Sequence, residues 1–530
     1  MTTTQRWTML AVVLGSAIVF LDGTIVNVAL ATIGRELPGS VFGTLEGLTY
    51  VTSGYFATLA ALLVLSGALA DYYGRRRIFI IGLVGFGATS ALCGLAPSLE
   101  LLVVARIVQG AAGALLVPGA IAIITAVFEG PGRARAFGIW AAATSAVGPL
   151  GLLIGGTLVD TVGWRVAFLI NIPLVAIALY AAITHMPETK NEQASGDFDW
   201  LGSLVAILAI GGLAFGVIRG QQHQWTDPVA WIALGIGIVA LIAFPMLMAR
   251  RPNPLVPLAL FRNRGFAIIN LSTLLIYSAL YVNFAFQSLV LQAALGYTAL
   301  AAGLVSLPNG ILLALLSTRI GTLAGRYGAR PFLVAGPLTM AAGLLWYTRL
   351  PAASMAWRAT VTDPSTLVPP AATLTDVLPA IVLFGVGISM VVAPLTSTLM
   401  SSVPTGNAGV ASAINNAISR VGQPILAALI FVVVSGTFYA TLGAIAGLDP
   451  NDPTLRQLQP LTMPPPGTPP AVAAAARAAS VDAFHVAAFV SATLLIGGAA
   501  TNFLGLRGLR SAAAAVGAQG EAVQPAGGAG

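Results

Sequence analysis

Stretches of about 20 mostly apolar residues recur along almost the whole chain, and this pattern restricts the possible folds more than any other feature. A helix of that length crosses the roughly 30 Å of hydrocarbon in a bilayer. In lipid only helices and closed barrels satisfy all their backbone hydrogen bonds, and continuous apolar runs are typical of helices. The chain is 57% hydrophobic and 8% charged, whereas soluble domains carry about 25% charged residues. We therefore predict an all-α integral membrane protein.

Fourteen membrane spans can be placed on the sequence. Their approximate ranges are 8–34, 48–70, 78–97, 100–128, 135–159, 164–186, 198–219, 228–249, 265–294, 298–325, 331–350, 377–400, 407–443 and 482–506. An even number puts both termini on one side. With that side inside, fifteen of the 25 Lys and Arg residues lie in cytoplasmic loops and tails and seven in outer loops, as the positive-inside rule requires. We expect a multi-pass protein of the cell (inner) membrane with both termini in the cytoplasm.

An internal repeat indicates a duplicated bundle. The stretch "GALADYYGRRR" follows the second span and "GTLAGRYGARP" follows the tenth, both at expected cytoplasmic turns. The two copies are eight spans apart, whereas two adjacent six-helix halves would place them six spans apart. Two additional helices therefore separate the halves. The expected domains are an N-terminal six-helix bundle (1–190), two inserted transmembrane helices (191–255), a C-terminal six-helix bundle (256–510) with a long external loop (444–481), and a disordered tail (511–530).

One carboxylate stands in the middle of the first span, in "FLDGTIVNVAL". An ionised Asp at the bilayer centre costs about 2.5 to 3.5 kcal/mol on insertion scales. The other seventeen acidic residues fall in loops, at span ends or in the tail. Asp22 is therefore predicted either to take up and release a proton or to form a structural bond with a neighbouring helix.

Taken together, several longer stretches resemble the fourteen-helix drug:proton antiporter branch of the major facilitator superfamily. They are "LDGTIVNVAL", "RIVQGAAGALLVPGA", "WRVAFLINIPL", "NRGFA" and "GVASAINNAISRVG", and the likeness covers nearly the whole chain. The resemblance implies two six-helix bundles around a central cavity that opens alternately to each side, with proton entry driving solute out.

Arg106 of the fourth span is the second candidate for proton coupling, beside Asp22. It is one of three basic residues inside the spans, and Gln109 shares its helical face. The resemblance implies that this arginine belongs to a proton relay, where its permanent charge can act on a nearby carboxyl. A structural arginine bonded to backbone carbonyls is the alternative.

The turn after the second span is expected to form a gate. Its members are Gly67, Asp71, Gly74, Arg75 and Arg76. Gly74 permits a sharp reversal, and an acid can bind an arginine or a helix N-terminus. The resemblance implies a latch that stabilises the state closed to the cytoplasm, and the second repeat has Gly325 in place of the acid. The positive-inside rule alone is the alternative, and it would explain the arginines in this cytoplasmic turn but not Asp71.

The fifth span carries the expected helix-packing signature Gly148, Pro149, Gly155 and Gly156. Small residues allow close helix packing and proline bends a helix. In the antiporters the Gly-Pro pair usually stands four residues before the Gly-Gly pair, whereas here it stands seven before. Ordinary close packing is the alternative reading of these residues.

Polar and aromatic residues in several spans are candidates for lining a substrate cavity. They are Asn27, Gln109, Tyr277, Tyr281, Asn283, Phe286, Gln287, Asn415 and Asn416. Such a surface suits amphipathic organic solutes, with cation–π attraction available at the aromatic rings. Interhelical hydrogen bonding would select the same residue types.

Other functional classes find no support in the sequence. The net charge of +7 is spread over short loops and does not favour nucleic acid. There is no phosphate-binding loop for a nucleotide, and the three His and one Cys form no metal site. We expect no enzyme, no cofactor and no metal, but a monomer in the lipid bilayer that uses the proton gradient to export a small organic substrate. Export of a dedicated endogenous product such as a lipid, siderophore or peptide is the alternative, and a non-transporting sensor or assembly partner is a weaker one.

Overall fold

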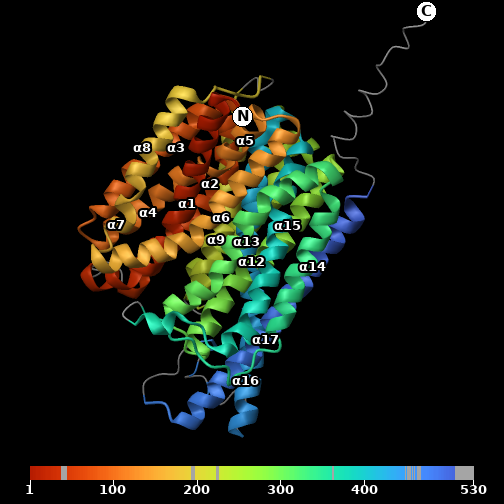
Figure 1. The fold of residues 1–530 in the computed structure, drawn as a ribbon. Coiled ribbons are helices and arrows are strands. Elements are labelled where there is room, and N and C mark those ends of the chain that lie inside the picture. Colours follow the sequence, from red (N-terminus) through yellow and green to blue (C-terminus); the bar gives the residue numbers. More distant parts are fainter. Residues whose placement is uncertain are drawn as a thin grey trace, which may run out of the picture.

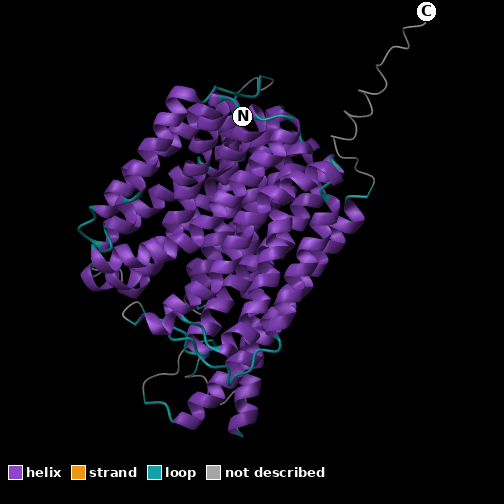
Figure 2. Ribbon diagram, viewed as in Figure 1, coloured by secondary structure: helices purple, strands orange, loops and turns teal. Residues whose placement is uncertain are grey.

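The computed structural model describes residues 1–37, 44–192, 197–222, 226–360, 363–447 and 467–507, with residues 449, 455, 458, 460 and 461. Inside the helices it leaves out some side chains, among them those of Asn27 and of residues 148–150, 152–157 and 420–425. Helices account for nearly all of the described part, which contains no strand, and the loops gather at the two ends of the bundle (Figure 2). The expectation of an all-α protein is confirmed.

The helices follow one another in three groups. The first contains α1 (Thr3–Glu36), α2 (Thr44–Tyr73), α3 (Arg75–Gly94), α4 (Leu99–Ala114), α5 (Val117–Val127), α6 (Gly130–Thr161), α7 (Val166–Leu169) and α8 (Asn171–His185). The second contains α9 (Trp200–Gln222) and α10 (Pro228–Arg250). The third contains α11 (Ala259–Arg262), α12 (Arg264–Leu289), η1 (Val290–Ala294), α13 (Ala299–Tyr327), α14 (Arg330–Tyr347), η2 (Pro364–Leu367), η3 (Thr373–Val377), α15 (Leu378–Ser401), η4 (Thr405–Asn407), α16 (Ala408–Ala446) and α17 (Pro470–Gly505).

Twelve segments of the described residues are long and apolar enough to cross a membrane, so the prediction of fourteen spans is not confirmed. Expected spans 100–128 and 164–186 each consist of two helices, α4 with α5 and α7 with α8. The expected spans at 135–159 and 331–350 correspond to α6 and α14, which are not among the twelve. Both helices are nevertheless part of the bundle, since α6 packs on α1 and α13, and α14 packs on α15 and α17.

Prolines explain the two interruptions within these spans. Pro118 stands at the start of α5, and Pro173 stands in the first turn of α8. Proline has no N–H to donate to the carbonyl four residues before it, so each helix restarts near its proline. The second break lies next to a buried polar residue, because α8 begins at Asn171.

The first and third groups of helices meet mainly along two pairs, α2 with α16 and α6 with α13. Both pairs touch closely near the side of the bundle on which the N-terminus lies, at the top of Figure 1 and called the N-terminal side below. There Gly67 of α2 lies against the backbone of Gly409 in α16. In the other pair, a Cβ added to Gly138 would lie 2.8 Å from Cα of Thr318. Only glycine allows backbones to approach this closely.

The inserted hairpin lies against both halves, because α9 packs on α2 and on α16. Its base is held by Asp199, which is 9% exposed and accepts hydrogen bonds from the backbone N–H groups of Gly202 (2.8 Å) and Leu255 (3.1 Å). At the other end Arg219 pairs with Asp227 (2.5 Å) and donates to the Tyr50 hydroxyl of α2.

The segment 444–481, expected to be an external loop, is helical at both of its ends. Helix α16 has 39 residues and continues to Ala446, while α17 has 36 residues and begins at Pro470, before the expected position 482. Both exceed the roughly 20 residues needed to span, and they project beyond the other helices opposite the N-terminal side (Figure 1). The Ala-rich start of α17 explains the error, because alanine has the highest helix propensity without being strongly apolar.

The other long outer segment, 351–376, is held to the bundle by hydrogen bonds. Trp357 Nε1 donates to the Thr366 carbonyl (2.8 Å), and Ser354 Oγ donates to Asp376 (2.7 Å). The Thr298 hydroxyl at the start of α13 donates to the Ala359 carbonyl (2.8 Å). The last of these bonds joins the segment to α13. The predicted disordered tail at 511–530 lies outside the described residues.

Candidate functional site

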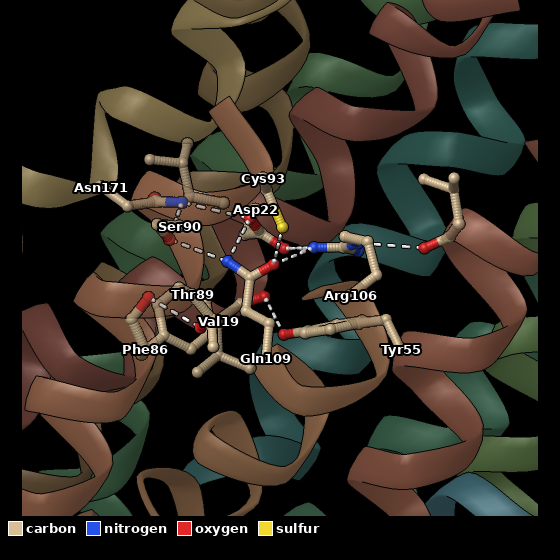
Figure 3. Close-up of polar contacts among 12 residues, drawn as sticks. Val19, Asp22, Tyr55, Phe86, Thr89, Ser90, Cys93, Arg106, Gln109 and Asn171 are labelled. Carbon is tan, nitrogen blue, oxygen red and sulfur yellow. Dashed lines mark hydrogen bonds and ion pairs between the residues drawn. The ribbon is translucent and has the colours of Figure 1, made fainter. Parts of the chain in front are cut away.

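A buried ion pair lies inside the first group of helices. Asp22 of α1 and Arg106 of α4 are both fully inaccessible to solvent, and Asp22 Oδ2 contacts Arg106 Nη1. Their side chains lie at the centre of a cluster to which α2, α3 and α8 also contribute (Figure 3). The deep carboxylate thus has a counter-charge, which burial of an ionised group requires.

The second carboxylate oxygen is bound by two amides. Asp22 Oδ1 accepts hydrogen bonds from Gln109 Nε2 at 3.2 Å and from Asn171 Nδ2 at 3.1 Å. Both amide nitrogens also donate to Ser90 Oγ of α3, at 2.8 Å and 3.3 Å. The Ser90 hydroxyl oxygen therefore links the two amides beside the carboxylate (Figure 3).

Arg106 is held in place from three directions. Its Nη1 donates to Gln109 Oε1 at 2.7 Å, and its Nε donates to the Val51 carbonyl of α2 at 2.9 Å. The guanidinium carbon lies 4.0 Å from the centre of the Tyr55 ring, a cation–π contact. Gly110 permits this arrangement, because a Cβ there would collide with the Tyr55 backbone. The arginine is thus fixed against α2 whether or not its carboxylate partner is charged.

A second ionic cluster joins the two halves at the N-terminal side. Asp71, at the end of α2, is 5% exposed and accepts hydrogen bonds from the backbone N–H groups of Gly409 (3.1 Å) and Val410 (2.9 Å). These groups belong to the first turn of α16, where the helix dipole favours an anion. Asp71 also pairs with Arg75 at 2.9 Å, and Arg75 Nη2 donates to the Thr405 carbonyl at 2.6 Å. One carboxylate and one guanidinium therefore bind α16 to the α2–α3 turn.

Comparison with known proteins identifies the family. A family model described as Major Facilitator Superfamily matches residues 12–427. The chain belongs to the Major Facilitator Superfamily.

Its similar curated relatives within the Major Facilitator Superfamily are named for drug resistance. Multidrug resistance protein Stp of Mycobacterium tuberculosis (strain ATCC 25618 / H37Rv) is 34% identical over 83% of this chain and 78% of Stp. Puromycin resistance protein pur8 of Streptomyces alboniger is 33% identical over 83% of this chain and 84% of that protein. The methylenomycin A resistance protein of Bacillus subtilis (strain 168) is 30% identical over 82% and 89%.

Solved structures of the superfamily share the fold. The human organic anion transporter MFSD10 (TETRAN) has a TM-score of 0.57 at 14% identity, covering 95% of this chain and 100% of that one. A bacterial homologue of the human lysosomal transporter Spinster, in an inward-facing conformation, has a TM-score of 0.53 at 18% identity, covering 96% and 98%. At these identities the likeness shows the fold alone, which is that of a multi-pass membrane transporter.

Of the proton-coupling and cavity residues expected in this superfamily member, the structure brings three together. Asp22, Arg106 and Gln109 form one cluster, in which the side chain of Gln109, also predicted to line the substrate cavity, bonds to the other two. Sequence reasoning assigned no role to Ser90 or Asn171. Asn171 lies within "WRVAFLINIPL", one of the stretches that carry the family resemblance, and this was the signal that could have found it.

The expected gate residues divide between two contacts. Gly67, Asp71 and Arg75 lie at the interface with α16. Gly74 has a φ of +111°, which a side chain rarely adopts, and so allows the turn. Arg76 lies away from the interface, since its Nη2 donates to the Ile183 carbonyl of α8 at 2.6 Å.

Sequence reasoning gave no role to Glu188, which caps the start of α3. Its two carboxylate oxygens accept from the backbone N–H groups of Arg76 (3.0 Å) and Arg77 (3.1 Å). A carboxylate at a helix N-terminus satisfies free N–H groups and complements the helix dipole. The segment after α8 therefore supports the turn that carries the gate.

Two of the expected cavity residues in the third group make hydrogen bonds within the protein. Asn415 Nδ2 of α16 donates to Asn270 Oδ1 (3.1 Å) and to Thr273 Oγ1 (2.8 Å) of α12, so it joins two helices. Asn416 Nδ2 donates to the Ser412 carbonyl within α16 at 2.9 Å. Their lining of a substrate cavity stays a prediction.

The remaining expected residues of α12 lie on neighbouring turns. The rings of Tyr277 and Tyr281 are 6.2 Å apart, and Asn283 Nδ2 donates to Gln287 Oε1 at 3.4 Å. Phe286 is 6% exposed. Five further residues lie in helices at positions whose side chains are not described, namely Asn27 and the packing signature Gly148, Pro149, Gly155 and Gly156, so their roles stay predictions.

Proposed function

We propose that this protein is a proton-coupled exporter of amphipathic organic compounds, cationic drugs among them. The carrying observation is the fully buried pair of Asp22 and Arg106 in a transporter of the Major Facilitator Superfamily. A buried charge pair needs a reason, because apolar residues in its place are often neutral or stabilising. Proton binding supplies that reason. The names of Stp and pur8, a multidrug and a puromycin resistance protein, support drugs as the substrate class.

Protonation of Asp22 would couple the proton to the transport cycle. In the described arrangement the carboxylate balances the charge of Arg106. A proton on Asp22 removes that balance and leaves a buried guanidinium whose attraction to α1 is lost, so α1 and α4 can move apart. Each elementary charge that crosses 100 mV supplies about 2.3 kcal/mol. One proton entering per molecule of a neutral solute is then enough to drive export against a concentration gradient. Exchange of one proton for one monovalent cation moves no net charge, so for such a drug the pH gradient alone supplies the energy.

We assign the N-terminal side of the bundle to the cytoplasm and count α6 and α14 as spans, which makes fourteen. The distribution of Lys and Arg supports the orientation. The 32 residues of α6 are long enough to span, and the 18 residues of α14 lie between α15 and α17, which are both candidate spans. On this assignment the gate at Asp71 closes the cytoplasmic side, and residues 1–190 and 256–510 are the two halves that rock around the cavity.

The proposed exporter works as a monomer in the lipid bilayer and needs no bound cofactor, because the proton gradient supplies the energy. The two halves of one chain already contain both the charge pair and the gate. Binding partners are then protons, lipid and a small organic solute.

A second candidate is the export of a product that the cell itself makes. The Tetracenomycin C resistance and export protein of Streptomyces glaucescens, 30% identical over 81% of this chain and 76% of that protein, supports this alternative by its name. Both candidates use the same proton coupling. They differ only in the solute that the cavity binds.

The test uses purified protein in proteoliposomes that contain a pH-sensitive dye and carry an imposed pH gradient. Addition of puromycin is expected to cause proton movement in the wild type and none in Asp22→Asn. Asp482→Asn is the matched control, because it removes one exposed carboxylate of α17. Undiminished substrate-driven proton flux in Asp22→Asn would refute Asp22 as the proton carrier. If the drug causes no proton movement in the wild type but a cell extract does, the second candidate is favoured.

A further inference from the structure

Every hydrogen bond that Asp22 receives comes from a nitrogen donor. Arg106 Nη1 donates to Oδ2, while Gln109 Nε2 (3.2 Å) and Asn171 Nδ2 (3.1 Å) donate to Oδ1. An ionised carboxylate accepts hydrogen bonds only, so this set of partners suits the ionised form. A protonated carboxyl has one O–H that must donate, and within the described residues no partner of Asp22 offers it an acceptor. Proton binding therefore requires one partner to reverse its role.

Two of the three partners cannot reverse. A guanidinium has five N–H donors and no acceptor, so Arg106 can only donate. The amide oxygen of Gln109 already accepts from Arg106 Nη1 at 2.7 Å. Turning the Gln109 amide would break this bond and direct its own N–H groups at the guanidinium. Both residues would lose hydrogen bonds without compensation, which is costly in a buried site.

Asn171 is free to reverse. It is fully buried, and within the described part of the chain its Oδ1 has no hydrogen-bond partner. Half a turn of the amide exchanges Oδ1 and Nδ2, and this terminal torsion has a broad, roughly two-fold profile. Oδ1 would then face Asp22 Oδ1 and Ser90 Oγ, the two atoms that Nδ2 faces now. Both neighbours can donate after protonation, because Ser90 carries a hydroxyl and Asp22 an O–H.

Other ionisable groups near Asp22 do not offer this exchange. The Tyr55 hydroxyl donates to the Val19 carbonyl of α1 at 3.3 Å. The Cys93 thiol donates to Gln109 Oε1, at a distance of 3.6 Å between sulfur and oxygen, and so is directed at the amide and not at the Asp22 carboxylate. Arg106, Tyr55 and Cys93 are the charged or titratable groups that the described residues of α2, α3 and α4 direct toward this cluster, and α8 contributes only neutral Asn171 (Figure 3).

We infer that Asn171 is the positioning residue that reports the proton state of Asp22, by turning its side-chain amide from donor to acceptor when the carboxyl is protonated. This inference rests on the proposed proton coupling through Asp22. Asn171 is the first residue of α8, directly after the break that separates α7 from α8. The amide reversal therefore connects the proton to a discontinuity between two helices.

Infrared difference spectroscopy tests the reversal directly. Spectra of the reconstituted protein at low and high pH are compared with and without ¹³C-labelled asparagine, which identifies side-chain amide carbonyl bands in the wild type. The carboxylic acid band that disappears in Asp22→Asn marks protonation of Asp22. The Asn171 carbonyl is unpartnered now and would accept two hydrogen bonds after reversal, so its band is expected to move to lower frequency at low pH. The moving band should be absent from Asn171→Leu and retained in the control.

Asn502→Leu is the matched control. Asn502 is also fully buried, its Nδ2 donates to Ser272 Oγ (2.8 Å) and the Leu333 carbonyl (2.9 Å), and its Oδ1 is unpartnered among the described residues. Asn171→Thr serves as a second variant if Asn171→Leu does not fold, since a hydroxyl can donate and accept.

The outcomes separate the inference from the proposed function. An Asp22 acid band without any shift of the Asn171 carbonyl overturns the inference and leaves the proton carrier intact. Absence of an acid band that depends on Asp22 refutes the proton carrier, and the inference with it. A shift that also occurs in Asp22→Asn overturns the link between the amide and the proton.

Discussion

Replacing Asp71 by Asn should open the N-terminal side of the transporter. Asp71 joins α2 to the first turn of α16 through two backbone N–H groups at 2.9 and 3.1 Å. It also neutralises Arg75, whose side chain is 2% exposed. Asparagine keeps the size of the side chain but loses the charge. The side-chain amide nitrogen of asparagine would direct its N–H groups at the N–H groups of Arg75 or of the α16 backbone, so hydrogen bonds would be lost.

The expected magnitude follows from the burial of the pair. Removing one partner of a buried ion pair costs about 3 to 5 kcal/mol, because the remaining charge is left uncompensated. That cost falls on the closed arrangement, since separation of the halves lets water reach Arg75. At about 1.4 kcal/mol per tenfold change, the equilibrium between closed and open N-terminal sides should shift by roughly 10²- to 4 × 10³-fold toward open.

Distances between spin labels measure this equilibrium. Cysteines replace Tyr73 at the end of α2 and Tyr327 at the end of α13, which are 43% and 64% exposed. The single native cysteine, Cys93, is buried and is changed to Ser. The variant should show a population at longer distance that the parent lacks. A distance distribution equal to that of the control Asp482→Asn would refute the reasoning, because that variant loses only an exposed charge.

Two further perturbations test the buried pair and the close helix contact. Arg106→Gln should lower the melting temperature of the purified protein, because it leaves Asp22 buried without its counter-charge. The double variant with Asp22→Asn should recover part of this loss. Equal melting temperatures of Arg106→Gln and the wild type would contradict a stabilising pair. Gly138→Val should prevent closure of the N-terminal side, because a Cβ there lies 2.8 Å from Cα of Thr318. The measurement is the reactivity of a cysteine placed at Tyr327 toward a water-soluble thiol reagent, which should rise in Gly138→Val. Gly436 has open space around it, so the control Gly436→Val should leave this reactivity unchanged.

Much of the helical architecture could be predicted from hydrophobic runs and prolines, since a chain in lipid has few alternatives to helices. The errors came where the membrane does not dictate structure. The start of α17 at Pro470 lies in an Ala-rich segment that is helical outside the expected span. Segment 351–376 is organised by single hydrogen bonds such as that of Trp357, which have no periodic signature.

The candidate site shows the same division. Asp22 and Arg106 were predictable because a charge inside an apolar run is conspicuous at any position. Asn171 and Ser90 were not, since neutral polar residues occur in many spans and only their neighbours give them a role. Gln109 was expected on the face of Arg106, but its bond to Asp22 could not be predicted, because helical spacing gives its face and not the residues opposite; its lining of the substrate cavity stays a prediction.

By itself, the sequence determined that this protein crosses a membrane repeatedly and that one carboxylate stands in the middle of a membrane-spanning segment, and its internal repeat predicted two related halves. Hydrophobicity and charge act on each segment separately, so they can be read along the chain. Only the tertiary structure decided which residues surround Asp22 and that Asp71 binds the start of α16, 338 positions away. Such contacts depend on how helices pack, and packing joins residues whose distance in sequence carries no information about their distance in space.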